Sequence, residues 1–178
     1  PLQAPPGALL EQWPLDLAQG AQAAQKLHAW LQGLAPARYA SATLINNAGV
    51  IPRIAPLADC AASDDLNDIA NALRVGLEAP MLLSAAFLAA TEGWGLPRKL
   101  LNISSGLGRR PMAAQAPYCA AKAGLDHFSR CLALEEAAKP HGARVCVLAP
   151  GVIDTDMQLQ LRSASAADFP DQERFAAL

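Results

Sequence analysis

The stretch Lys99–Gly151 decides the fold: it opens with KLLNISSG (99–106) and closes with ARVCVLAPG (143–151). Both ends are nearly continuous apolar runs followed by small or polar residues, a pattern typical of parallel strands buried on both faces. Between them, residues 118–138 have a helical pattern that Pro140 helps to stop. A strand, a helix and a second strand in this order predict a right-handed βαβ unit.

The same alternation extends toward the start of the sequence. ATLINNAG (42–49) is a further strand candidate, LLEQWPLDL (9–17) is a weaker one with a Pro inside it, and helical patterns cover 19–34 and roughly 64–91. Repeated alternation predicts an α/β protein with a Rossmann-type doubly wound parallel sheet, in three layers (α/β/α) and one domain. In such sheets, ligands bind beyond the carboxyl ends of the strands.

The composition excludes several classes of protein. The 178 residues are 52% hydrophobic and 17% charged with a net charge of −2, which indicates a globular domain without a basic field for nucleic acid. The longest apolar run, residues 79–90, is too short to span a bilayer, and the four cysteines have neither CxxC nor zinc spacing. We therefore expect no membrane, nucleic-acid or metal partner and a reduced, cytoplasmic location.

Tyr118 and Lys122 stand four residues apart at the start of the helical stretch 118–138. Pro117 suits a first helical turn, and the i, i+4 spacing places the phenol and the ammonium on one face. A nearby ammonium stabilises phenolate and lowers its pKa, which suits proton transfer to or from a carbonyl. By itself, such a pair is more often a chance surface pair than a functional one, so other motifs have to decide.

Five motifs together resemble the short-chain dehydrogenase/reductase family. They are LDL (15–17), NNAG (46–49), NISSG (102–106), YCAAK (118–122) and PGVIDT (150–155). Their order and spacing agree with the family over almost the whole chain, and Ser105 precedes Tyr118 by thirteen residues as it does there. The segment after Tyr118 and the stretch APGVIDTDMQ resemble the sepiapterin reductase branch.

The resemblance implies an NAD(P)-dependent oxidoreductase that reduces a small-molecule carbonyl, or oxidises a secondary alcohol, by hydride transfer. It makes Tyr118 the acid/base, Lys122 the group that tunes it and holds the nicotinamide ribose, and Ser105 a donor to the substrate oxygen. The implied cofactor contacts are Asp16, Leu17, Asn47, Ala48, Gly49, Tyr118, Lys122, Pro150, Gly151, Ile153 and Thr155. We favour NADP(H) over NAD(H), although the residue that decides between them is not among these 178.

Each motif also has a purely structural interpretation. Asp16 is equally suited to cap the helix 19–34, NNAG to end a strand and PG to form a turn, while Ser104 and Ser105 can cap the segment that follows them. The alternative function is a catalytically silent nucleotide-binding sensor or scaffold of the same fold. An epimerase or dehydratase with the same Tyr and Lys is a third possibility. The complete Ser, Tyr and Lys set favours the reductase.

Two departures from the family bear on function. Gly76 stands where the family usually has an Asn that supports a water linking the Lys to solvent, and Asn71 lies more than a turn away. The family's glycine-rich phosphate turn, its first two strands and its last strand are also absent. By resemblance, residues 1–178 are one NAD(P)-binding domain that is incomplete at both ends, and we expect the missing elements to lie in the protein outside this sequence. Residues 156–178 are expected to form a substrate loop.

An apolar stripe along 118–138 predicts self-association. Its members are Ala121, Gly124, Leu125, Phe128 and Leu132, a stripe wider than one sheet face needs. Small residues allow close helix–helix approach, and in the family this helix commonly packs against a partner subunit. We therefore expect a homodimer or homotetramer.

Overall fold

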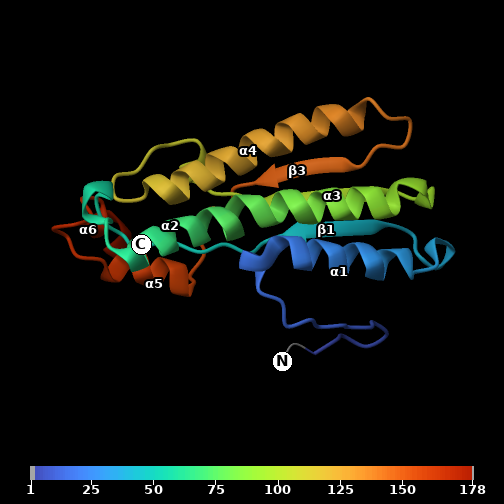
Figure 1. Ribbon diagram of the computed structural model, residues 1–178, viewed down its shortest axis with the longest axis horizontal. Coiled ribbons are helices and arrows are strands. Elements are labelled where there is room, and N and C mark those ends of the chain that lie inside the picture. Colours follow the sequence, from blue (N-terminus) through green and yellow to red (C-terminus); the bar gives the residue numbers. More distant parts are fainter. Residues whose placement is uncertain (1–2, 178) are drawn as a thin grey trace.

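A computed structural model describes residues 3–177, which form a three-stranded parallel sheet with six α-helices (Figure 1). The strands are β1 (Ala42–Asn46), β2 (Arg98–Ile103) and β3 (Arg144–Leu148). The helices are α1 (Gly20–Gln32), α2 (Ser63–Leu73), α3 (Ala79–Thr91), α4 (Ala116–Ala137), α5 (Asp156–Ser163) and α6 (Gln172–Ala176). A π-helical turn, η4 (Arg74–Glu78), joins α2 to α3, and the 3₁₀ turns η1 (Leu17–Gln19) and η6 (Gly106–Gly108) precede α1 and follow β2.

The sheet has the order β1-β2-β3, and both pairs are parallel. Leu44 of β1 lies opposite Leu100 of β2, which lies opposite Val145 of β3. Helices connect successive strands, because parallel neighbours need a long crossover. The predicted βαβ unit and the Rossmann-type parallel sheet are confirmed, as are the three helical stretches.

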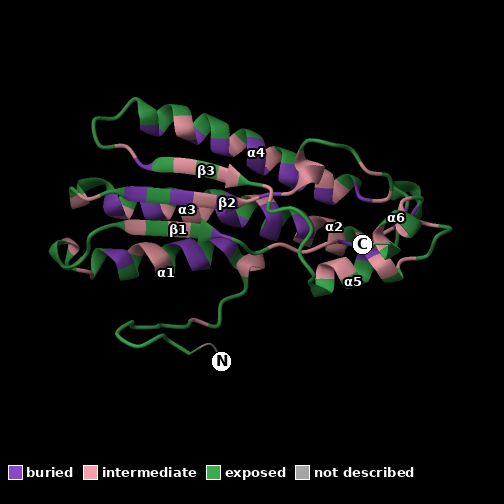
Figure 2. Ribbon diagram, turned by 180° about the vertical axis from the view of Figure 1, so that it is seen from behind, coloured by how far each residue is buried: buried purple, intermediate pink, exposed green. Residues whose placement is uncertain are grey.

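Helices cover one face of the sheet in the part of the chain that the structure describes. The core between the sheet and α1, α3 and α4 contains Leu31, Phe87, Leu88, Leu100, Leu132 and Ala143. On the opposite face, seen from the front in Figure 2, Ile45 is 57% exposed and Leu148 is 46% exposed. The expectation that β1 and β3 are buried on both faces is therefore wrong for residues 3–177. Of the three layers expected, these residues contribute two.

The weak strand candidate 9–17 is not a strand. It is an exposed irregular segment that runs beside α1 (Figure 1). Its attachment is made by the carboxylate of Glu11, which accepts hydrogen bonds from the indole N–H groups of Trp13 at 2.6 Å and Trp30 at 2.9 Å. The segment is therefore held to α1 by side-chain hydrogen bonds and not by a strand ladder. Pro14 would also leave such a ladder without one backbone N–H donor.

The apolar run 79–90 is part of a longer helical unit than the sequence predicts. Helices α2 and α3 and the turn between them extend continuously from Ser63 to Trp94, which is long and apolar enough to cross a membrane by length and composition alone. Half of its most apolar window is buried inside the chain. That burial is typical of a core helix, and α3 packs on both α1 and the sheet.

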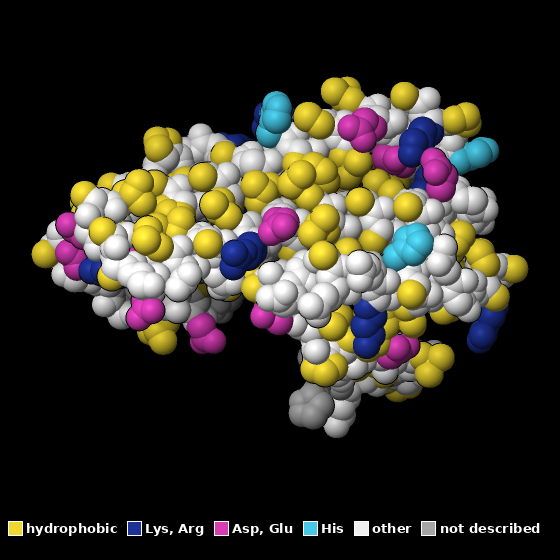
Figure 3. Space-filling model, in the orientation of Figure 1, with side chains coloured by type: hydrophobic (Ala, Val, Ile, Leu, Met, Phe, Trp, Pro, Cys, Tyr) yellow, Lys and Arg dark blue, Asp and Glu magenta, His cyan; other side chains and the backbone are white. Residues whose placement is uncertain are grey.

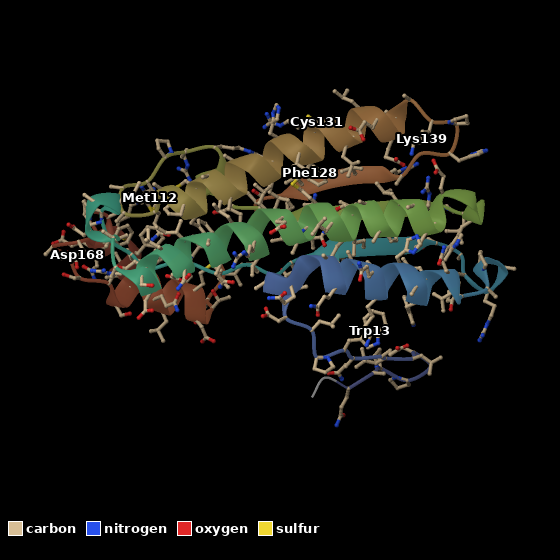
Figure 4. All side chains as sticks on the ribbon, in the orientation of Figure 1. Trp13, Met112, Phe128, Cys131, Lys139 and Asp168 are labelled. Atoms are coloured by element: carbon tan, nitrogen blue, oxygen red, sulfur yellow. The ribbon has the colours of Figure 1, made fainter. Side chains whose placement is uncertain are left out.

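The apolar stripe of α4 is used within the chain. Ala121, Leu125 and Leu132 are buried, and Phe128, labelled in Figure 4, packs against the core cluster. Gly124 approaches η4 so closely that a Cβ there would lie 2.9 Å from the Leu77 Cδ2. These residues already contact their own sheet and η4, and self-association stays a prediction.

A buried polar cluster ties the end of α4 to the starts of β2 and β3. The carboxylate of Glu136 accepts a hydrogen bond from the Ala143 N–H at 2.8 Å and lies 3.5 Å from the Arg98 guanidinium, and both side chains are almost fully buried. Burial by itself raises the pKa of Glu136, but the Ala143 N–H, Lys139 and Arg98 together bring that pKa below its ordinary value. Gly142 is required beside them, because a Cβ there would overlap the Glu136 carbonyl.

This cluster predicts a pH-dependent stability difference for Glu136→Gln. A carboxyl with a lowered folded pKa stabilises the fold above its unfolded pKa of about 4.3, and that contribution is lost as pH falls through the folded value. At pH 7 the substitution leaves Arg98 buried without its counter-charge, so we expect a loss of about 3 kcal/mol in the free energy of unfolding. Urea titrations should show the difference from wild type shrinking below about pH 4. The exposed neighbour Glu135→Gln is the control, and an equal, pH-independent loss in both variants would contradict this account.

Candidate active site

A cavity of about 260 Å³ opens beyond the carboxyl ends of β2 and β3. It brings together Ser105 after β2, Tyr118 at the start of α4 and Gly151 after β3, three residues singled out from the sequence. Parallel strands end at one edge of the sheet, which is why motifs far apart in the sequence meet there. Helices α5 and α6 close the other side of the cavity.

Tyr118 sits in the first turn of α4, where Pro117 is the second helical residue after Ala116. Its side chain is 7% exposed, and its hydroxyl donates a hydrogen bond to the Met157 Sδ at 3.8 Å. Met157 belongs to α5, so residues that were expected to form a substrate loop do touch the phenol. A thioether is a weak acceptor, so the phenol can donate its proton to a stronger acceptor when one is present.

Lys122 lies one turn further along α4 and is 4% exposed. Its Nζ donates to the Ile103 carbonyl at 3.0 Å and lies 5.7 Å from the centroid of the Tyr118 ring. Gly49, three residues after the end of β1, borders the same ammonium: a Cβ at Gly49 would lie 3.4 Å from Nζ. The ammonium is thus held at the strand ends, under the ring and beside the loop that follows β1.

Ser105 has the capping role that was its structural alternative. Its Oγ accepts a hydrogen bond from the Leu107 N–H at 3.2 Å, at the start of η6. The same side chain lines the cavity with Tyr118, so capping fixes the hydroxyl in place and does not remove it from the site. The turn is pressed against α4, because a Cβ at Gly108 would lie 2.9 Å from the Lys122 carbonyl oxygen.

The pKa of Tyr118 is shifted in the direction opposite to the sequence expectation. Burial raises the pKa of Tyr118 above its ordinary value, the Ser105 hydroxyl lowers it and nearby Cys119 raises it. Burial lowers the pKa of Lys122, and Asp126 raises it. The expectation that Lys122 brings the phenol pKa down is therefore not met. The ammonium donates to the Ile103 carbonyl, while the phenol is desolvated.

The residues expected to hold the cofactor lie along the same edge. Asn47 and Ala48 are exposed, and Gly151 has a φ of 85°, a conformation that favours glycine and keeps the turn after β3 open. Pro150, Ile153 and Thr155 are exposed in that turn but do not line the cavity. These backbone-rich, uncovered strand ends fit a dinucleotide, and the contacts assigned to individual residues stay predictions.

Asp16 has a capping role. Its Oδ1 accepts a hydrogen bond from the Ala18 N–H at 2.9 Å and caps η1, the turn that leads into α1. Leu17 follows it within this turn, which contacts η4. Asp16 therefore caps η1 and not α1, whose N-cap residue Gln19 makes no side-chain cap hydrogen bond, and the adenine contact of Asp16 and Leu17 stays a prediction.

Gly76 is buried in η4 and faces α4. A Cβ there would lie 3.2 Å from the Cβ of Ala121, the residue before Lys122. Any side chain at this position would press on α4 next to the catalytic candidates. Glycine in place of the usual Asn thus coincides with a close contact between η4 and α4, which a longer side chain at position 76 would disturb.

Arg110 and Met112 line the cavity but were not predicted from the sequence, whereas Met157, Arg174 and Phe175 lie in the expected substrate loop 156–178. Met112 lies near the end of the molecule where α5 and α6 are found (Figure 4). Neither Arg110 nor Met112 belongs to a motif, and the one available signal was their position between NISSG and YCAAK. Among the described residues, no group of three or more His, Cys, Asp or Glu side chains has an arrangement that could hold a metal ion.

A family model described as short chain dehydrogenase matches residues 8–166. The chain belongs to this family. Benzil reductase ((S)-benzoin forming) of Bacillus cereus is 36% identical over 135 residues, which cover 76% of this chain and 53% of that protein. The enzyme of the same name from Bacillus subtilis (strain 168) is 33% identical over 169 residues, covering 95% of this chain and 68% of that protein.

Solved structures and a second group of relatives agree with this assignment. A metagenomic short-chain oxidoreductase in complex with NADP has a TM-score of 0.64 at 29% identity, covering 96% of this chain and 68% of that one. Sepiapterin reductase of Rattus norvegicus is 33% identical over 73% of this chain. The benzil reductase of Bacillus subtilis matches more of the chain, so the sepiapterin resemblance is one likeness among several. This chain spans about half the length of the Bacillus cereus relative.

The burial of Tyr118 predicts a late ionisation of its phenol. We expect the phenolate absorbance change, taken as wild type minus Tyr118→Phe, to have its midpoint above the ordinary value of about 10. Ser105→Ala should move this midpoint further up, because Ser105 lowers the pKa of Tyr118. Spectrophotometric titration in the near ultraviolet measures both shifts. A midpoint at or below the ordinary value would show that Lys122 dominates after all.

Proposed function

We propose that this chain provides the catalytic site of an NAD(P)-dependent carbonyl reductase in which Tyr118 is the proton donor. One observation carries the proposal: the hydroxyl-bearing side chains of Ser105 and Tyr118 line one cavity at the strand ends, with the ammonium of Lys122 beneath the Tyr118 ring. Membership of a family of dehydrogenases and the named reductases among its relatives support this reaction class.

A nicotinamide dinucleotide, when bound, would supply the hydride. The residues suited to hold it are the exposed loop Asn47–Gly49, the turn Pro150–Thr155 and Lys122. We favour NADP(H), since an NADPH-dependent pterin aldehyde reductase from Arabidopsis thaliana is among the relatives and the metagenomic structure holds NADP. Asp16 and Leu17, near η4, are proposed to border the adenine.

The proton belongs to Tyr118. Because burial raises the pKa of its phenol, the hydroxyl is protonated at neutral pH and can donate as negative charge develops on the carbonyl oxygen. Ser105 is suited to donate a second hydrogen bond to the same oxygen. Once the proton has left, the nearby ammonium of Lys122 stabilises the phenolate. A phenol that is protonated at neutral pH suits the reductive direction at that pH.

A catalytically silent nucleotide-binding protein is the second candidate, and two observations favour it. The Tyr118 hydroxyl is engaged with Met157, and Gly76 replaces the usual Asn. The complete Ser105, Tyr118 and Lys122 set favours the reductase.

We further propose a cytoplasmic location, which is consistent with the four cysteines being free thiols.

Two variants separate these functions. Tyr118→Phe should bind NADPH with nearly unchanged affinity but reduce ketones and aldehydes at least about 100-fold more slowly, because only the proton donor is lost. Lys122→Ala should weaken NADPH binding as well. Steady-state rates and fluorescence titrations of the cofactor measure both effects. A wild-type protein that binds NADPH but reduces no carbonyl in a broad panel would support the silent binder instead.

We also propose a homo-oligomer, now on a different surface from the α4 stripe. The helical face carries exposed apolar side chains, including Leu66, Leu73, Met81 and Leu134, and Figure 3 shows hydrophobic groups spread over this face. Burying them in a two-fold interface would stabilise an assembly. Light scattering of the full-length protein at micromolar concentration should give at least twice the chain mass. Leu134→Glu should lower that mass, and a monomeric wild type would overturn the proposal.

A further inference from the structure

We propose that Arg110 recognises a carboxylate beside the reacting carbonyl, so that the preferred substrates are 2-oxo acids with an apolar or aryl body. The inference rests on the proposed reductase function and names the substrate class of the same site. In the reaction, hydride adds to the ketone carbon, Tyr118 gives its proton to the oxygen, and the products are a 2-hydroxy acid and NAD(P)⁺.

Arg110 is held close to the reacting groups. Its N–H donates to the Gly106 carbonyl at 3.1 Å, which closes the turn that begins at Ser105. The side chain folds back over this turn, since a Cβ on Gly106 would lie 3.2 Å from the Arg110 Nη2. The guanidinium therefore packs over the residue next to Ser105, and both Arg110 and Ser105 line the cavity with Tyr118.

The charge of Arg110 is uncompensated. No carboxylate or other acceptor within residues 3–177 pairs with its side chain. The adjacent Arg109 differs, because its Nε lies 3.2 Å from the Asp126 Oδ2, outside the cavity wall. A guanidinium without a partner at a cavity wall offers two parallel N–H donors to a planar anion, and carboxylate is the group that this fork matches.

The rest of the cavity indicates what the carboxylate is attached to. Arg174 of α6 and Asp171, which precedes that helix, contribute one charge of each sign, which leaves Arg110 as the excess positive charge. The remaining wall is mainly apolar and includes Ile51, Leu107, Met112, Val152, Met157 and Phe175. A substrate with an anionic end beside its carbonyl and an aryl or branched apolar body matches both features.

The test compares an acid with its neutral ester. The reduction of phenylglyoxylate and methyl phenylglyoxylate is measured for the full-length wild type, Arg110→Gln and Arg130→Gln. NADPH is the reductant, and NADH is used in parallel. Arg130 is exposed on α4 and does not line the cavity, so it controls for loss of one positive charge. We expect Arg110→Gln to lower kcat/KM for the acid by roughly 10- to 100-fold, chiefly through KM. The ester, and both substrates with Arg130→Gln, should change by less than about threefold.

The outcomes separate this inference from the reductase function. If wild type reduces the ester and not the acid, or if Arg110→Gln affects both equally, the substrate assignment is wrong and the reductase function stands. If neither compound is reduced, calorimetric titration of phenylglyoxylate into the same three proteins decides the recognition step. The carboxylate site is supported if phenylglyoxylate binds to the wild type and Arg110→Gln weakens this binding at least about tenfold while Arg130→Gln leaves it unchanged. If phenylglyoxylate does not bind, the proposal is overturned.

Discussion

The hydrogen bond between Asn46 and Asn102 sets the relation between sheet and helices at the active edge. These two residues lie opposite each other at the ends of β1 and β2, and the Asn46 Nδ2 donates to the Asn102 Oδ1 at 2.8 Å. Asn46 also donates to Ser84 of α3 at 3.2 Å, and Asn102 donates to Ser129 of α4 at 2.8 Å. Because buried amides need partners, both helices are held to the strand ends just before the loops that carry Gly49 and Ser105.

Much of the fold could be predicted because each strand and helix has a clear period and clear stops. The exposure of Ile45 and Leu148 could not, since an apolar run does not report which neighbours cover its two sides. The segment 9–17 was ambiguous for a related reason: its hydrophobic residues accompany a Glu11–Trp30 contact that only tertiary structure reveals. The periodicity of the local sequence thus predicted the strands and helices. Which of their faces are buried depended on the tertiary structure of the whole chain.

For the site, ordered motifs located the three catalytic candidates but not the directions in which the pKa values of Tyr118 and Lys122 are shifted. The pKa of Tyr118 depends on how much water reaches the phenol, and that in turn depends on Met157 and the wall around it. Desolvation acts on both members of the pair, so it favours a neutral phenol and opposes a charged Lys122. Arg110 and Met112 were missed because this part of the cavity wall comes from a segment that carries no motif.

Helix α4 is a continuous helix whose two ends are both fixed by contacts with other parts of the fold. Tyr118 occupies one end, and Glu136 is fixed near the other by Arg98 and the Ala143 N–H. The two residues are separated by about 27 Å along the helix axis, at 1.5 Å per residue. An axial slip at the Glu136 end is therefore transmitted almost undiminished to the phenol, where misplacement by about 1 Å can cost a factor of roughly 100 in rate. A substitution at Gly142 that displaces Glu136 is therefore expected to shift Tyr118 along the helix axis.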